Sequence, residues 1–168
     1  MSVIFTVIIC AVLVSADQII KFFVVEYLRP VQYTDVIKDV LRFRYVENSG
    51  AVFGSFATHT VILTIVSVIL LGITIYFLCT NKSKSKFINV CLILMISGGV
   101  GNIIDRIRLG YVVDFIEPLF VNFAVFNFAD CLITVGAFSL IIYLIVDLVR
   151  DAKSTKNKVE TVKNDGEN

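Results

Sequence analysis

Long apolar stretches alternate with short polar ones along the chain, and four of the apolar stretches are long enough to cross a membrane. They cover about residues 3–25, 57–79, 87–104 and 129–149. At a rise of about 1.5 Å per residue, a helix of about 20 residues spans the roughly 30 Å of hydrocarbon in a bilayer. The pattern predicts an all-α polytopic membrane protein with four transmembrane helices.

The first apolar stretch also has to be compared with a cleaved signal peptide. Val14-Ser15-Ala16 has the small residues that are typical of a cleavage site. However, no lysine or arginine precedes the stretch, and apolar residues resume after Asp17 as far as Val25. These two features favour a helix that is retained.

Between the first two spans, residues 31–56 contain the pattern of a β-strand. In residues 41–46 (LRFRYV) apolar and basic side chains alternate with period two, as expected for a strand with one buried face. Asn48-Ser49-Gly50 then provides a turn signal. The sequence therefore predicts a small extracytoplasmic β-sheet domain beside the helices.

The positive charges predict how the chain is oriented in the membrane. Three lysines lie in residues 81–86, between the second and third spans, and more follow the fourth span. Because lysine and arginine in short loops favour the cytoplasmic side, we expect both termini in the cytoplasm. Residues 1–150 are expected to form one membrane-embedded domain. Residues 151–168 are polar, mixed in charge and without aromatic residues, so a disordered cytoplasmic tail is expected.

The composition agrees with a membrane protein and excludes several kinds of site. Of the 168 residues, 57% are hydrophobic and 17% are charged, whereas soluble domains are about 45–50% apolar and about 25% charged. The four cysteines lie in or beside apolar runs without metal-ligand spacing, which predicts small buried side chains. His59 is the only histidine, so a multi-histidine metal site is excluded. The sequence has no glycine-rich phosphate loop and no basic–aromatic patch for nucleic acid, and we expect no cofactor.

Polar residues in and beside the spans gather at one predicted depth. Asp17 lies about 21 Å along the first helix, near its outer end. The outer ends of the third and fourth helices reach the same level. Ionisable groups in a membrane are costly and usually mark a functional site, so we expect a polar site at the outer membrane boundary. The residues that converge on this level are Asp17, Lys21, Asn102, Asp105, Arg106, Asp114, Asn127 and Asp130.

Several of these residues also have a purely structural explanation. Asp17 and Lys21 are four residues apart and can pair on one helix face. Asp105 can pair with the adjacent Arg106 at the end of a helix. Asp130 can cap the fourth helix, since aspartate suits a helix N-terminus.

Asp114 is the hardest of these residues to explain structurally. It interrupts the apolar run 111–116 (YVVDFI), and no cation is adjacent in sequence. Desolvation there would raise its pKa. Two close carboxyl groups share one proton, so that one can activate water while the other polarises a carbonyl group. The residues alone leave open which two of the four aspartates, at positions 17, 105, 114 and 130, form such a pair.

Proteins of two other functional classes could also have aspartates in their membrane spans. A small proton- or ion-coupled membrane transporter would also have intramembrane carboxylates. Its polar path should continue through the cytoplasmic half, yet the second span has no charged residue. In a non-enzymatic membrane chaperone or assembly factor, the aspartates would be only structural.

Five short segments resemble, in order, the motifs of the bacterial lipoprotein signal peptidases, the signal peptidase II family of aspartyl proteases. They are residues 17–21 (DQIIK), 48–53 (NSGAVF), 98–106 (GGVGNIIDR), 110–115 (GYVVDF) and 126–130 (FNFAD). Each is short, but all five at these spacings are specific. They extend from the first span into the fourth.

The resemblance implies a multi-pass hydrolase of the bacterial inner membrane that removes signal peptides from prolipoproteins. Its substrates carry diacylglycerol on a cysteine, and cleavage occurs just before that cysteine, near the outer leaflet. The resemblance implies that Asp114 and Asp130 are the catalytic pair. Membrane lipid is the other expected partner, and we expect a monomer. The residues implied to bind substrate or support the site are Asp17, Lys21, Asn48, Gly50, Asn102, Asp105, Arg106 and Asn127.

Overall fold

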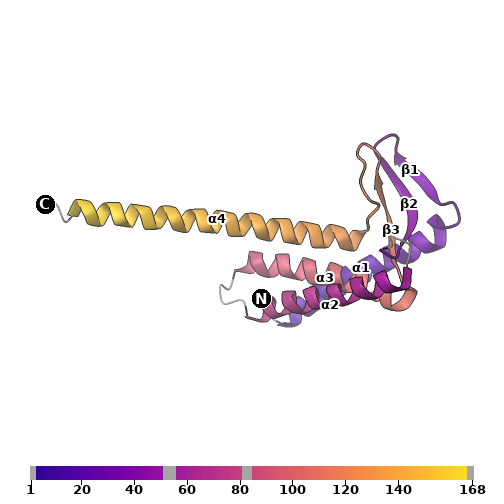
Figure 1. Ribbon diagram of the computed structural model, residues 1–168, viewed down its shortest axis with the longest axis horizontal. Helices are drawn as coiled ribbons and strands as arrows, with labels where there is room; N and C mark the ends of the chain where they lie inside the picture. Colours follow the sequence, from indigo (N-terminus) through magenta and orange to yellow (C-terminus); the bar gives the residue numbers. More distant parts are fainter. Residues whose placement is uncertain (1–2, 51–55, 81–84, 166–168) are drawn as a thin grey trace.

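Four long helices run side by side, and a small β-sheet lies at one end of them (Figure 1). The computed structural model describes residues 3–50, 56–80 and 85–165, without the side chains of residues 56–59 and 154–165. The beginning of α1 and the far end of α4 both lie away from the sheet (Figure 1).

The helices are α1 (Val3–Phe23), α2 (Phe56–Thr80), α3 (Lys86–Leu109) and α4 (Phe128–Asp165). Four helical segments are long and apolar enough to cross a membrane. They are Val3–Leu28, Thr60–Thr80, Lys86–Leu109 and Phe128–Lys153. The predicted four-span architecture is confirmed.

The outer faces of these helices expose large apolar side chains. Val12, Ile69 and Leu148 are each at least half exposed. In water such exposure costs about 25 cal/mol for each Å² of apolar surface, whereas hydrocarbon removes this cost. The exposed faces are therefore the surfaces that a bilayer would cover.

The central helix of the bundle is α3, which packs against α1, α2 and α4. It begins after Ser85, whose hydroxyl oxygen accepts a hydrogen bond from the Ile88 N–H at 3.5 Å. It ends at Gly110, which has the left-handed φ of +82° and donates its N–H to the Arg106 carbonyl oxygen. Because glycine adopts this conformation without steric cost, the chain can turn sharply there into the sheet.

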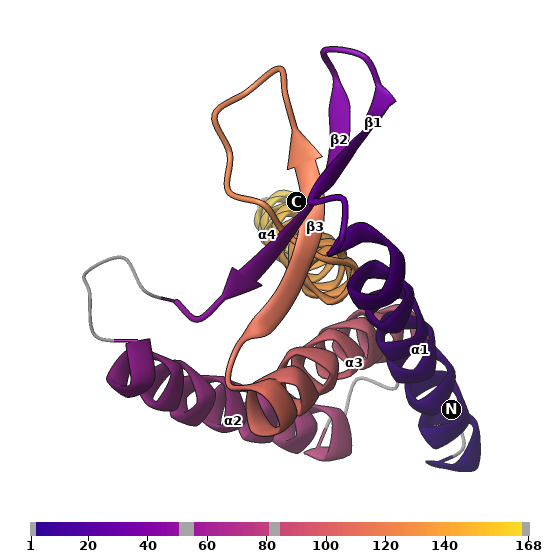
Figure 2. The ribbon, with the colours of Figure 1, turned by 90° about the vertical axis from the view of Figure 1, so that its right-hand side faces the viewer.

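The sheet consists of three antiparallel strands in the order β1 (Tyr33–Ile37), β2 (Leu41–Asn48) and β3 (Val112–Pro118) (Figure 2). The first two come from the segment predicted to be β-rich, and β3 comes from the connection between α3 and α4. The predicted small sheet is therefore confirmed, and its third strand joins the outer segment to the bundle.

The sheet is anchored to the C-terminal end of α1 by a small apolar core. After α1, the chain continues as a π-helical turn, η1 (Val24–Leu28), whose first and last residues are buried. These two side chains pack with Tyr45 of β2 and with Val113 and Phe115 of β3. This core fixes the position of β3 relative to α1.

The segment after the fourth span differs from the prediction. Residues 151–165 continue α4 as a helix, whereas their polarity predicted a disordered tail. The segment has no glycine or proline before Gly166, and much of it consists of good helix formers such as lysine. A helix that already exists in the span can extend into such a segment without a new nucleation step. Residues 166–168 lie outside the described residues.

Candidate active site

Asp114 lies in β3, and its side chain is 1% exposed. Its two carboxylate oxygens each accept a hydrogen bond from an amide. The Asn127 amide donates to Oδ1 at 2.6 Å, and the Asn48 amide donates to Oδ2 at 2.8 Å. Asn48 pairs with Val112 across the sheet, so it reaches Asp114 as a diagonal neighbour on the same face.

The segment after β3 folds back and places Asn127 beside Asp114. Phe126 forms an isolated bridge with Ile116, and the Phe126 carbonyl oxygen accepts hydrogen bonds from the N–H groups of Phe115 and Ile116. The next residue along the chain is Asn127, which is fully buried. The pairing with β3 therefore aligns the beginning of α4 with the strand that carries Asp114.

Asn127 and Asp130 cap the beginning of α4 reciprocally. The Asp130 N–H donates to Asn127 Oδ1 at 3.0 Å, and the Asn127 N–H donates to Asp130 Oδ2 at 3.2 Å. This arrangement is a capping box, in which Asn127 is the N-cap and Asp130 is the third residue of the helix. Asp130 therefore takes part in the cap of the fourth helix, as its reciprocal member, and the N-cap residue is Asn127. Asn127 also hydrogen-bonds to both Asp114 and Asp130, so it links the two carboxyl groups.

Asn102, in α3, connects Asp130 to a buried cation. Its amide nitrogen donates to Asp130 Oδ1 at 2.7 Å. Its carbonyl oxygen accepts from Lys21 Nζ at 3.0 Å and from the Asn127 amide at 3.2 Å. Residues from α1, α3 and α4 therefore meet at this one side chain.

Lys21 is 3% exposed and forms two ion pairs. Its Nζ lies 3.1 Å from Asp17 Oδ2 and 2.8 Å from Asp105 Oδ2. The pairing of Lys21 with Asp17 agrees with their spacing along α1. Asp105 pairs with Lys21 and not with the adjacent Arg106, because successive residues of a helix point in different directions.

Asp17 and Asp105 also hold the backbone next to the two central aspartates. Asp17 Oδ1 accepts the Ala129 N–H at 3.1 Å, one residue before Asp130. Asp105 Oδ2 accepts the Val113 N–H at 3.2 Å, one residue before Asp114. The buried charge group thus braces both the first turn of α4 and the middle of β3.

Gln18 belongs to the same network, although the sequence interpretation did not include it among the site residues. Its amide donates to Asp105 Oδ1 at 3.0 Å and lies 3.2 Å from Asp17 Oδ2 and 3.3 Å from the Gly101 carbonyl oxygen. A long polar side chain next to Asp17 in an apolar span was the signal that could have identified it.

Gly50 shapes the chain just after β2. It has a φ of +72°, and its N–H donates to Asn48 Oδ1 at 2.9 Å. This bond orients the Asn48 amide so that its nitrogen faces Asp114. The remainder of this predicted motif, residues 51–53, lies outside the described residues.

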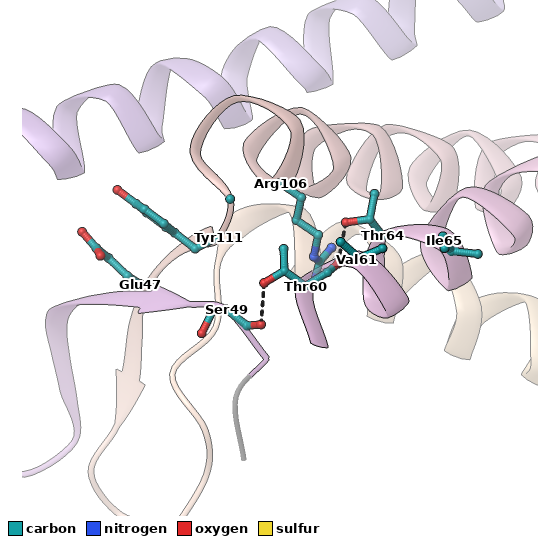
Figure 3. Close-up of a pocket in the computed structure, with 9 residues that line it drawn as sticks. Glu47, Ser49, Thr60, Val61, Thr64, Ile65, Arg106 and Tyr111 are labelled. Carbon is teal, nitrogen blue, oxygen red and sulfur yellow. Dashed lines mark hydrogen bonds between the residues drawn. The ribbon is translucent and has the colours of Figure 1, made fainter. Parts of the chain in front are cut away.

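Arg106 extends from the C-terminal end of α3 toward α2 and lines a cavity of about 740 Å³ (Figure 3). Within the described part of the chain, its guanidinium group has no ion pair or hydrogen bond. Asp130, Asp114 and Asp105 all act electrostatically on it. The cavity has apolar walls from α2 and polar groups from the end of β2. The residues lining it are Glu47, Ser49, Thr60, Val61, Thr64, Ile65, Arg106, Gly110 and Tyr111.

A second cavity, of about 380 Å³, contains Asp114 in its wall. Glu47 and Ser49 line both cavities, so the two meet at the end of β2. The Ser49 carbonyl oxygen accepts a hydrogen bond from the Thr60 hydroxyl at 2.9 Å, which ties this end to α2 (Figure 3). One cavity therefore lies beside Arg106 and the other beside Asp114.

Burial raises the pKa of Asp114 to about 6. The hydrogen bonds from Asn127 and Asn48 act in the opposite direction, because they stabilise the carboxylate. The negative charge of Asp130 contributes to the increase, and the positive charge of Lys21 opposes it. A carboxyl group with such a pKa can hold a proton near neutrality and act as an acid.

The described residues contain no group of three or more histidine, cysteine or carboxylate side chains arranged to hold a metal ion. Of the four free cysteines, Cys91 is buried and Cys79 is exposed. The polar groups gathered around the two central aspartates are carboxyl groups, amides, the Lys21 ammonium group and the Arg106 guanidinium group.

Comparison with known protein families gives a match over most of the chain. Residues 9–146 match the family model for signal peptidase II. A lipoprotein signal peptidase from Streptococcus agalactiae is 36% identical over 137 residues, which cover 82% of this chain and 89% of that protein. One from Streptococcus thermophilus is 39% identical over 132 residues, covering 79% of this chain and 86% of that protein.

Two solved structures, both described as a bacterial membrane enzyme, have the same fold. One, at 2.3 Å, superposes with a TM-score of 0.77 at 29% identity and covers 87% of this chain and 90% of its own. The other, at 1.9 Å, has the same TM-score and identity and covers 84% of this chain and 93% of its own.

Proposed function

The chain belongs to the signal peptidase II family, and on this premise we propose that it removes signal peptides from prolipoproteins by an aspartyl mechanism. Family membership also makes the chain a peptidase, which decides against the transporter and the chaperone. The observation that carries the proposed mechanism is the position of Asn127, which hydrogen-bonds to both Asp114 and Asp130.

The two aspartates are proposed to have different roles. Asp130 lies in the first turn of α4, where the helix dipole favours a negative charge. It also lies in the field of the Arg106 guanidinium group. Asp114 is buried in a strand and has a raised pKa. We therefore assign Asp130 as the ionised base and Asp114 as the protonated acid.

In this mechanism the Asp130 carboxylate takes a proton from water, and the water oxygen attacks the scissile carbonyl carbon. The Asp114 carboxyl group donates a hydrogen bond, and then its proton, to the carbonyl oxygen. When the tetrahedral intermediate collapses, the C–N bond breaks and the leaving nitrogen takes the proton that Asp130 accepted from water. One hydroxyl group of the intermediate returns a proton to Asp114, so both aspartates regain their starting states. The products are the carboxyl terminus of the signal peptide and a free amino group on the cysteine.

The substrate is proposed to be a precursor whose cysteine already carries diacylglycerol, with cleavage immediately before that cysteine. The two neighbouring cavities, which share Glu47 and Ser49 in their walls, are proposed to hold the peptide beside Asp114. The larger one has apolar walls on α2, where Val61 and Ile65 are exposed toward the surroundings of the helix. An acyl chain can leave the site along such a wall without contact with water.

Both termini are proposed to lie in the cytoplasm, with the active site near the outer leaflet. The lysine-rich residues 81–86 support this orientation. The aspartates lie at the end of the bundle that carries the sheet, and the chain begins and ends away from it (Figure 1). A lipid-anchored cysteine would present its peptide bond at that depth.

The substrate is tested with a precursor peptide in detergent or lipid, prepared with and without diacylglycerol on the cysteine. We expect cleavage of the lipidated peptide only, and mass spectrometry should find the cysteine at the new N-terminus. Equal cleavage of both peptides, or cleavage at another bond, would contradict the proposal.

A further inference from the structure

Three asparagine amides point their nitrogen atoms at the two aspartates. Asn48 and Asn127 donate to Asp114, and Asn102 donates to Asp130. The two ends of an asparagine amide are nearly identical in shape, so its hydrogen-bond partners determine its orientation. Each of the three orientations therefore needs a donor at the amide oxygen.

Backbone groups supply that donor for two of the three amides. The Gly50 N–H holds the oxygen of Asn48, and the Asp130 N–H holds the oxygen of Asn127. A backbone N–H can only donate, so both amides have their nitrogen directed at Asp114. These two orientations follow from a local turn and from the cap of α4.

The Asn102 amide has no backbone donor among the hydrogen bonds of the described residues. Its oxygen faces Lys21 Nζ at 3.0 Å, with a longer contact of 3.2 Å from the Asn127 amide. An ammonium group has three N–H donors and no acceptor, so it excludes the reversed orientation of Asn102. The three acceptors around it are Asp17, Asp105 and Asn102, which account for all three donors.

We propose that Lys21 is a positioning residue, whose ammonium group fixes the Asn102 amide so that the amide nitrogen faces the Asp130 carboxylate. This inference rests on the proposed function of Asp130 as the base. Lys21 would act on Asp130 through Asn102, in addition to its electrostatic effect on Asp114. A purely structural Lys21 would instead neutralise Asp17 and Asp105 and have no effect on Asp130.

The test needs a variant that removes the cation without adding buried charge. Asp17, Asp105 and Lys21 together carry a net charge of −1. The double variant Asp17→Asn/Lys21→Met retains this net charge, because only Asp105 remains ionised. It is measured beside Lys21→Met and Lys21→Arg. If Lys21→Met fails to accumulate in membranes, the activity of the double variant is used instead to test the role of Lys21.

The matched control for stability is Ile93→Ala. Ile93 is 1% exposed in α3, and it is not among the residues of the site. Truncating it leaves a cavity that destabilises the same helix bundle. The change in kcat of Ile93→Ala therefore measures the effect of lost stability alone.

We expect kcat of the double variant to fall by about 10- to 100-fold, because a misplaced catalytic group is costly. KM should change less than threefold, because Asn102 faces Asp130 and not the cavities. The pH profile of kcat/KM should also differ from that of Ile93→Ala, because the Asp130 carboxylate loses a well-oriented donor. Lys21→Arg should retain most of kcat. The charged groups around Asp130 that remain in this variant are Asp114, Asp105 and Arg106.

A kcat and a pH profile in the double variant that match those of Ile93→Ala would overturn the inference. The same assay includes Asp114→Asn, which should be inactive. If Asp114→Asn remains active, the aspartyl mechanism itself fails. The two failures can be told apart. Asp114→Asn tests the aspartyl mechanism, whereas the role of Lys21 is tested by the change in kcat of the double variant relative to the unmodified chain.

Discussion

At the scale of single residues, the behaviour of Asp114 depends on two opposing effects. Two amide donors favour its charged form, while burial favours its neutral form. Burial has the larger effect and brings the pKa to about 6. The result is an acid that can be protonated near neutrality and can still lose its proton during the reaction.

The pH dependence of cleavage should show this pKa. Asp114 must be protonated to act as the acid, so kcat/KM should fall as the pH rises through about 6. A bound substrate removes water and raises the pKa further, so kcat should fall only at a higher pH. Both parameters are measured from pH 4 to pH 9 with one lipidated peptide.

Alkaline limbs of kcat and kcat/KM at the same pH would contradict this assignment of the acid. Because the two carboxyl groups are coupled, the apparent values describe the pair. The charged groups that act electrostatically with Asp114 are Asp130, Lys21 and Arg106. Arg44 and Glu47 line the same cavity.

At the scale of elements, the sequence predicted the spans and the strands but not all the contacts between them. Span length and strand alternation are local patterns, and they located all four helices and the β-rich outer segment. The Lys21–Asp105 ion pair joins residues 84 positions apart, so only the packing of α1 on α3 reveals it. The capping box of α4 is also a local pattern. The sequence predicted its Asp130 as a cap but not Asn127, which is the N-cap residue.

Gly101 provides a test of the packing between these elements. A Cβ atom at this position would lie 2.5 Å from Asp17 Oδ2 and 3.4 Å from the Ala129 Cβ. We expect Gly101→Ala to lower the unfolding free energy by about 1–3 kcal/mol, because an added methyl group has no room there. Thermal unfolding in detergent and the rate of cleavage measure the effect.

Gly72→Ala is the control for this substitution. Gly72 also lies inside a helix, but a Cβ atom there would have no neighbour within 4 Å. Alanine is the better helix former by about 1 kcal/mol, so this variant should be at least as stable as the unmodified chain. Equal loss of stability in the two variants would show that the contact of Gly101 with Asp17 is unimportant.

At the scale of the whole molecule, polar chemistry and apolar surface are separated along the bundle. The aspartates, the amides and the sheet lie at one end, and the exposed apolar side chains cover the helices. The sequence predicted this separation from the depth of its charged residues. It could not predict that α4 continues as a helix to Asp165, because polarity alone does not distinguish a solvated helix from a disordered chain.

Thiol labelling in intact cells tests the proposed orientation. The four native cysteines are first replaced, and one cysteine is then introduced as Lys38→Cys or Lys153→Cys. Both positions are exposed. Lys38 lies between β1 and β2, and Lys153 is the last residue of the fourth span, Phe128–Lys153. A membrane-impermeant reagent should label the first from outside and the second only after permeabilisation. The reverse pattern would place the active site on the cytoplasmic side.

The most direct test of the central claim is the cleavage of a diacylglyceryl-modified precursor by Asp114→Asn and Asp130→Asn. Each variant should accumulate in membranes like the unmodified chain but lose at least 1000-fold in kcat/KM, about 4 kcal/mol of transition-state stabilisation. Near-normal turnover by either variant would contradict the account, because the proposed mechanism needs both carboxyl groups.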